Sequence, residues 1–137
     1  MKDKISNYLL LLSIVLFIIA CTQKCYCTDN DCGEYGSGMV VLIIGAFGIF
    51  SGGACLAWLA NPLILLAWVT AKSPKFSLIL SIIALTIGIS FLFFDEIIRD
   101  EAGHYGKITG YKAGYYLWNL SFISMIVRNY LKLKHRN

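Results

Sequence analysis

The stretch Met39–Thr70 reads MVVLIIGAFGIFSGGACLAWLANPLILLAWVT and contains no charged residue. A helix needs about 20 apolar residues to cross a hydrocarbon core of roughly 30 Å, so this stretch is too long for one straight span. Pro62 lacks a backbone N–H and clashes with the preceding turn, which predicts a kink or break beside Asn61. We therefore expect a spanning helix over 39–60, with a kinked continuation over 62–70.

Three further apolar stretches flank this one, over 5–21, 76–94 and 108–131. None of the four alternates apolar and polar residues at strand length, so a membrane barrel is not expected. The sequence predicts an all-α fold, a transmembrane helical bundle of four helices forming one domain over 1–137. Its outer loops are expected over 22–38 and 95–107, and no charged side chain is expected in the centre of a span.

The composition of the chain supports this class. Of its 137 residues, 58% are hydrophobic and 15% are charged, against roughly 25% charged residues in average soluble domains. A small soluble domain cannot bury that much apolar surface. A disordered chain has the opposite composition, with low hydrophobicity and high charge. Both classes are therefore excluded.

The charged residues divide unequally between the two sides of the predicted bundle. The N-terminus, the 71–75 turn and the C-terminal tail hold eight basic residues and one acid, whereas the other two loops hold four basic residues and seven acids. Basic residues accumulate on the cytoplasmic side of membrane proteins. We therefore expect a multi-pass protein of the bacterial inner (plasma) membrane with a cytoplasmic C-terminus. The basic charge is explained by topology, and no nucleic-acid partner is expected.

The N-terminal apolar run has two interpretations. It follows Lys2 and Lys4 and ends in Ile18-Ile19-Ala20-Cys21, which resembles a bacterial lipobox. In such signals the chain is cut before the cysteine, which then carries the lipid, and three spans would remain. The alternative is an uncleaved first helix that ends in Cys21. Both interpretations place Cys21 on the outer side.

Four of the five cysteines lie close together in the first outer loop, as Cys21, Cys25, Cys27 and Cys32. Disulfides persist outside the cytoplasm, so we expect Cys32 to pair with either Cys25 or Cys27. The spacing does not match a zinc ribbon and no histidine is near, so no metal site is expected. There is also no C-x-x-C redox pair.

Small and polar residues within the apolar stretches are candidates for helix contacts. Gly45, Gly48 and Gly52 recur at helical spacing, which lets backbones approach closely inside a bundle or between copies of the chain. Asn61 and Asn119 are the polar intramembrane candidates. Asn61 can satisfy carbonyls that Pro62 leaves without donors, which favours a structural role.

No catalytic set is recognisable in the sequence. Both histidines, His104 and His135, lie outside the expected spans, and there is no H-E-x-x-H or G-x-S-x-G motif. We therefore expect neither an enzyme nor a cofactor.

Several segments together resemble a known group of proteins. They are Trp58-Leu-Ala-Asn-Pro62, Asp100-Glu-Ala-Gly103, Ile108-Thr-Gly110 and Gly114-Tyr-Tyr-Leu-Trp118. This set is similar to WLANP-like, DEGG-like and GYYLW-like segments in a group of small uncharacterised four-helix bacterial inner-membrane proteins. The resemblance covers roughly residues 25–127, and it departs at Ala102 and Asn119. It implies placement in a bacterial inner membrane and adds no activity.

These observations lead to one functional expectation and one alternative. We expect a non-enzymatic integral membrane protein that acts through protein interactions, as an accessory subunit or an immunity-type protein. Its partners would be the lipid bilayer and a membrane protein or further copies of itself. The alternative is a small oligomeric channel or transporter lined by Asn61, Asn119 and helix hydroxyl groups.

Overall fold

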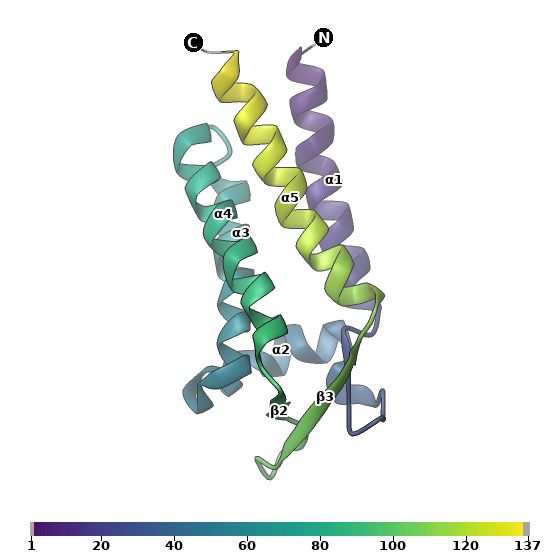
Figure 1. Ribbon diagram of the computed structural model, residues 1–137. Helices are drawn as coiled ribbons and strands as arrows, with labels where there is room; N and C mark the ends of the chain where they lie inside the picture. The colour runs from purple at the N-terminus through teal and green to yellow at the C-terminus, as the bar shows by residue number, and fades with distance from the viewer. Residues whose placement is uncertain (1, 136–137) are drawn as a thin grey trace.

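The computed structural model describes residues 2–135, and most of them are helical (Figure 1). Both ends of the chain lie at the same end of a helical bundle, together with the short turn between α3 and α4. A small sheet lies at the opposite end. The α-helices are α1 (Lys2–Thr22), α2 (Gly38–Gly48), α3 (Ala60–Val69), α4 (Pro74–Ser90) and α5 (Ala113–Lys134).

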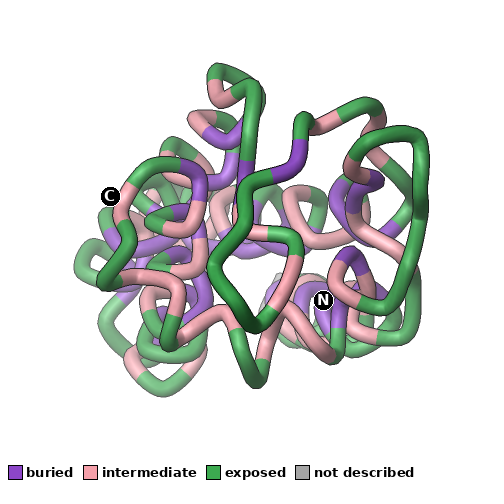
Figure 2. Tube along the Cα trace, turned by 90° about the horizontal axis from the view of Figure 1, so that it is seen from below, coloured by how far each residue is buried: buried purple, intermediate pink, exposed green. Residues whose placement is uncertain are grey.

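The bundle buries several polar side chains beside its apolar core, and it exposes many large apolar side chains. Helix α1 packs along α5, α5 along α4, and α4 along α3. Four serines in these helices are fully buried, whereas large residues such as Ile79 and Leu11 are more than half exposed. Figure 2, viewed from the end that carries the sheet, shows buried and exposed segments alternating along the helices. The fully buried serines are Ser13, Ser77, Ser81 and Ser121.

Serine hydroxyls connect the helices directly. Ser13 Oγ of α1 donates to the Ser121 carbonyl of α5 at 2.7 Å, and Ser124 Oγ of α5 donates to the Leu9 carbonyl at 2.9 Å. Ser77 Oγ of α4 donates to the Ala67 carbonyl of α3 at 2.7 Å. A small hydroxyl lets two helices approach closely and still gives a buried carbonyl an additional donor.

A charged side chain is buried in the bundle near the end of the expected 108–131 span, although the sequence counts it with the basic C-terminal tail. Arg128 of α5 is 3% exposed and donates to the Ala71 carbonyl just beyond α3, and to Asn129 Oδ1. Asn129 Nδ2 in turn donates to Ser77 Oγ of α4. A guanidinium at the carboxyl end of a helix compensates the free carbonyls and the negative dipole end. Arg128 therefore joins α5 to the end of α3.

The stretch expected as one helix over 39–60 is broken in its middle. Helix α2 ends at Gly48 and is followed by two 3₁₀-helices, η2 (Ile49–Ser51) and η3 (Gly53–Leu59). Between them Gly52 has φ 71°, a left-handed conformation that glycine adopts without strain. Pro62 lies in the first turn of α3, where proline is tolerated, so the break occurs ten residues before the expected position. Helix α2 consequently runs across the bundle axis (Figure 1).

The fold also contains a three-stranded antiparallel sheet, so it is not all-α as expected. Strands β1 (Tyr26–Thr28) and β2 (Glu96–Ile98) both pair with the central β3 (Tyr105–Tyr111). Residues 108–111, expected at the start of the last span, therefore belong to the sheet, and α5 begins only at Ala113. Strands this short carry little periodic signal, and β1 pairs with a segment about 80 residues away.

Two of the described helical segments are long and apolar enough to cross a membrane by length and composition, namely Lys4–Thr22 and Pro74–Phe93. The second includes the 3₁₀-helix η4 (Phe91–Phe93) that extends α4. Gly38–Ser51 and Gly53–Val69 are apolar helical segments of shorter length.

The hydroxyl contacts predict unequal effects of one substitution at two sites in α4. Ser77→Ala removes the donor to Ala67 and the acceptor for Asn129, and it should lower the free energy of unfolding by about 1–2 kcal/mol. Ser90→Ala removes only a bond to the Ile87 carbonyl of the same helical segment and should change it by less than about 0.5 kcal/mol. Reversible unfolding of the detergent-solubilised protein measures both. Equal losses would contradict the interhelical role of Ser77.

Candidate functional site

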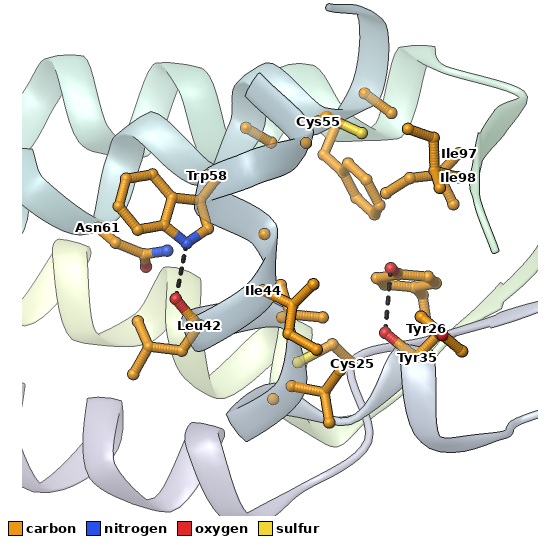
Figure 3. A pocket seen from close by; sticks show the side chains of 18 of the residues that line it. Cys25, Tyr26, Tyr35, Leu42, Ile44, Cys55, Trp58, Asn61, Ile97 and Ile98 are labelled. Atoms are coloured by element: carbon orange, nitrogen blue, oxygen red, sulfur yellow. Dashed lines mark hydrogen bonds between the residues drawn. The ribbon is translucent and has the colours of Figure 1, made fainter. Parts of the chain in front are cut away.

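A cavity of about 360 Å³ lies at the sheet end of the bundle (Figure 3). One wall is α2, a second is η3, and the strand β2 with the turn that follows it forms a third. Most of the lining is apolar. The side chains labelled in Figure 3 surround the open space, and they come from these walls and from neighbouring segments of the chain. They are Cys25, Tyr26, Tyr35, Leu42, Ile44, Cys55, Trp58, Asn61, Ile97 and Ile98.

The position of α2 depends on a close backbone contact at its first residue and on a hydrogen bond from a tryptophan side chain further along. A Cβ at Gly38 would collide with the Ala20 carbonyl at the end of α1, and the Gly38 N–H donates to the Gln23 carbonyl at 2.9 Å. Further along, Trp58 Nε1 of η3 donates to the Leu42 carbonyl of α2 at 2.9 Å. These contacts hold α2 across the bundle and define one side of the cavity.

The three glycines singled out in the sequence have different surroundings. A Cβ at Gly45 would meet the Trp58 ring at 2.6 Å, and one at Gly48 would meet Cys55 at 3.2 Å. Both glycines therefore face η3 of the same chain. Gly52 lies outside α2, in the left-handed turn, with nothing within 4 Å of its Cβ position.

The cavity ends at a cluster of polar and aromatic groups between α3 and α5. Trp118 Nε1 of α5 donates to Asn61 Oδ1 of α3 at 2.8 Å, and Asn61 is 4% exposed. Asn119, one residue further, donates to the Tyr115 carbonyl of its own helix at 3.0 Å and does not contact Asn61 through a hydrogen bond. The Tyr115 hydroxyl donates to the Gly88 carbonyl of α4 at 2.8 Å. This cluster closes the cavity toward the bundle.

The disulfide joins Cys27 to Cys32, one of the two pairings that the sequence left open. The intervening turn contains Asp29 and Asn30 at φ 50° and φ 65°, the left-handed values of a two-residue hairpin turn. Thr28 and Asp31 exchange backbone hydrogen bonds across this turn. The cysteines are the next pair along the hairpin, with Cα atoms 4.3 Å apart, as in a non-hydrogen-bonded antiparallel pair.

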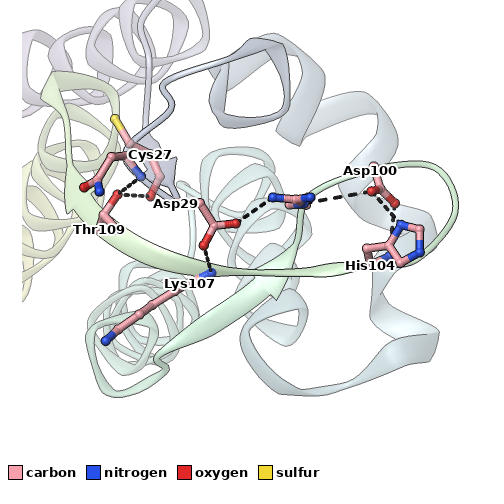
Figure 4. Close-up of polar contacts among 8 residues, drawn as sticks. Cys27, Asp29, Asp100, His104, Lys107 and Thr109 are labelled. Carbon is pink, nitrogen blue, oxygen red and sulfur yellow. Dashed lines mark hydrogen bonds and ion pairs between the residues drawn. The ribbon is translucent and has the colours of Figure 1, made fainter.

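An ion-pair chain connects the hairpin turn to the turn between β2 and β3 (Figure 4). Arg99 Nη1 lies 2.8 Å from Asp29 Oδ2 and its Nε lies 4.0 Å from Asp100 Oδ2. Asp29 also accepts the Lys107 backbone N–H, while Asp100 accepts the His104 N–H and contacts His104 Nδ1 at 2.8 Å. The His104 N–H, together with its ring, lowers the pKa of Asp100. These bonds hold the loop over 22–38 and the loop over 95–107 in fixed positions relative to each other.

The free thiols that line the cavity are weak nucleophiles. Cys21, Cys25 and Cys55 are free and half-buried, and all three line the cavity. Burial, together with the neighbouring Cys21, raises the pKa of Cys25 to about 12. At neutral pH Cys25 is therefore a protonated thiol with the character of a small apolar group rather than a nucleophile. The lining as a whole suits the binding of an apolar group.

Sequence reasoning missed the cavity because its walls are distant in the chain and one wall was assigned to a span. The signal that could have revealed the wall is Gly52-Gly53, a glycine pair typical of a turn rather than of a helix interior. The Asp29-Asn30 pair likewise indicates a tight hairpin, and it would have favoured Cys27 over Cys25 as the partner of Cys32.

Comparison of the chain with protein-family models, with curated proteins and with solved structures gives no match. The similarity to a group of small bacterial inner-membrane proteins therefore stays a prediction.

Alkylation followed by intact-mass spectrometry tests the thiol assignment. Unfolded without reductant, the chain should gain three adducts, at Cys21, Cys25 and Cys55, and it should gain five after reduction. In the folded protein at pH 8, Cys25 should react about a thousand-fold more slowly than an ordinary cysteine, because so little of it is thiolate.

The Cys25→Ser variant identifies the slow adduct in that experiment. Five adducts without reductant would contradict the disulfide. Two adducts together with a lipid mass would instead show that Cys21 is acylated.

Proposed function

We propose that the chain is an integral membrane protein whose helical bundle lies in lipid. The observation that carries this proposal is the number of large apolar side chains exposed on helices that also bury polar groups. Serine, asparagine and arginine are buried between helices, while exposed positions of the same helices carry Ile79, Ile82, Leu65 and Leu120. Hydration of this apolar surface by water would be unfavourable, whereas a bilayer solvates it and favours polar contacts between helices.

The lengths of the helical segments support four spans. Segment Gly53–Val69 has only 17 residues. Seven of them are in the 3₁₀-helix η3, which rises about 2.0 Å per residue against 1.5 Å in an α-helix, so the segment reaches roughly 29 Å. Helix α5, with 22 residues, reaches about 33 Å. Both lengths suit a hydrocarbon core of roughly 30 Å.

The two ends of the bundle differ in charge, which supports an orientation. Lys72 and Lys75 lie in and just after the α3–α4 turn, at the same end as Lys132 and Lys134 of the last turn of α5. The sheet end carries most of the acids. By the positive-inside rule, the chain termini lie in the cytoplasm and the sheet lies outside the inner membrane.

Helix α1 is proposed as a permanent member of the bundle rather than a cleaved signal. It packs along the whole of α5, buries Phe17 and Ala20, and shares the Ser13 and Ser124 bonds with that helix. Cleavage before Cys21 would remove these contacts and expose the polar face of α5 to lipid. This proposal favours four spans and a free Cys21.

The outer platform, defined as strands β1–β3, the Cys27–Cys32 hairpin and the 3₁₀-helix η1 (Glu34–Gly36) that follows it, is proposed as the binding surface for a protein partner. The disulfide and the Arg99–Asp29 pair hold its loops in fixed positions, so little loop ordering is needed on binding. Its exposed carboxylates, including Glu34 and Glu96, suit a partner with a basic surface. We thus propose a non-enzymatic protein that acts as an accessory subunit or an immunity-type protein.

The channel alternative has weaker support. Asn61, proposed to line a path, is 4% exposed and accepts a hydrogen bond from Trp118, while the helix serines bond to carbonyls. Polar groups that are already paired within the chain offer little to a hydrated ion.

Charge reversal on the platform tests the proposed function. Cross-linking and co-purification of the tagged full chain should recover a protein partner, and Glu34→Lys should weaken its capture by about threefold or more. Lys75→Glu, at the opposite end, is the matched control and should leave capture unchanged. Recovery of a symmetric homo-oligomer alone, with ion flux in liposomes, would overturn the proposal in favour of a channel.

A further inference from the structure

We propose that the cavity between α2, η3 and β2 binds the acyl chain of an amine-bearing phospholipid from the outer leaflet. The inference goes beyond partner binding by the outer platform, and it rests on the proposed membrane placement of the bundle. Three features of the described residues carry it: an apolar access route, the character and size of the interior, and the charge at the rim.

Helix α2 provides the access route. Ile44 and Phe47 line the cavity and are also 46% and 74% exposed, so the cavity lining continues onto the outer surface of α2 without a polar barrier. Ile43 and Phe50, at 62% and 92% exposed, extend this apolar surface. An apolar helix too short to span a bilayer is typical of an interfacial segment, and α2 has only 11 residues. Lipid chains of the outer leaflet therefore reach the cavity from the side.

The interior suits a hydrocarbon chain. Phe17, Ala54, Ala57 and Phe91 contribute apolar surface, and the free thiols add small polarizable groups. The indole N–H groups of Trp58 and Trp118 in the wall are already bonded, to the Leu42 carbonyl and to Asn61 Oδ1. A volume of about 360 Å³ lies within the range of pockets that hold small ligands, and one chain segment of a lipid is of that scale.

The rim of the cavity on the sheet side is acidic. Asp100 and Glu101 both line it, next to Tyr35. Burial and the charges of Glu101 and Asp100 raise the pKa of Tyr35. Asp100 is bonded to His104, whereas Glu101 is exposed and forms no ion pair among residues 4–135.

The negative charge of the rim favours some lipid headgroups over others. An ammonium headgroup would be attracted to Glu101, while the carboxylate of a fatty acid or a phosphoglycerol headgroup would be repelled. The occupant that fits both the interior and the rim is therefore an amine-bearing phospholipid such as phosphatidylethanolamine.

Tryptophan fluorescence gives a direct test, because Trp58 and Trp118 line the cavity and Trp68 does not. The purified full chain in detergent is titrated with phosphatidylethanolamine that carries bromine atoms, which quench tryptophan, on its acyl chain. We expect saturable quenching at one lipid per chain. Brominated phosphatidylglycerol should bind about threefold more weakly, because the headgroup contact is a solvent-exposed ion pair.

Two variants locate the binding. Val41→Phe fills the cavity from α2 and should remove the saturable quenching, while the matched Val69→Phe, at an 80% exposed position of α3, should keep it. Glu101→Gln changes an exposed residue, so the chain stays folded, and it should abolish the headgroup preference. Far-UV circular dichroism verifies the fold of each variant.

The proposal is overturned if the wild type shows no saturable quenching, if Val41→Phe binds as well as Val69→Phe, or if phosphatidylglycerol or a fatty acid binds as tightly as phosphatidylethanolamine. Retention in vesicles after alkaline extraction separates this failure from that of the proposed function. A chain that stays in the vesicles without saturable quenching contradicts the lipid site alone. A chain that is extracted contradicts the membrane placement as well.

Discussion

Bonds from buried serine hydroxyls to carbonyls of neighbouring helices are the contacts on which the rest of this structure depends. Ser13, Ser77 and Ser124 each bring two helices close enough for their backbones to be linked. Under the proposed membrane placement the hydrophobic effect gives no net drive between helices, so packing of small residues and such bonds must hold the bundle. Arg128 has a similar role at the end of the bundle opposite the sheet, where it donates to the Ala71 carbonyl just beyond α3.

The second constraint is the glycine pair Gly52-Gly53, which turns the chain between α2 and η3. A continuous helix over this segment would have left no wall for the cavity. Because the chain turns, α2 lies across the end of the bundle and forms a wall opposite β2. The platform above it is closed by pairing between loops that are distant in sequence, with β3 between β1 and β2. The bundle and the cavity therefore depend on the interhelical serine bonds and the glycine turn, whereas the platform depends on pairing between distant loops.

The mainly helical character, the helices over 5–21 and 76–94 and an outer-loop disulfide were predictable, because long apolar runs and clustered cysteines are local signals. The sheet was not predictable, since β1 and β2 have three residues each and gain their stability from a distant partner. Arg128 was counted with the basic residues of the C-terminal tail, because composition does not reveal that the Ala71 carbonyl lies beside it. The cavity depends on how α2 is oriented, which hydropathy alone does not specify.

The central claim is that four helical segments lie in lipid with their polar side chains turned inward. Its most direct test is the collision of spin labels with oxygen and with a water-soluble nickel chelate, at single cysteines introduced in a reconstituted protein whose free cysteines are replaced. Labels at Leu65, Ile82 and Leu120, on α3, α4 and α5, should collide frequently with oxygen and rarely with nickel. Nickel-accessible labels at Leu65 or Leu120, with only Ile82 protected, would contradict the four-span account.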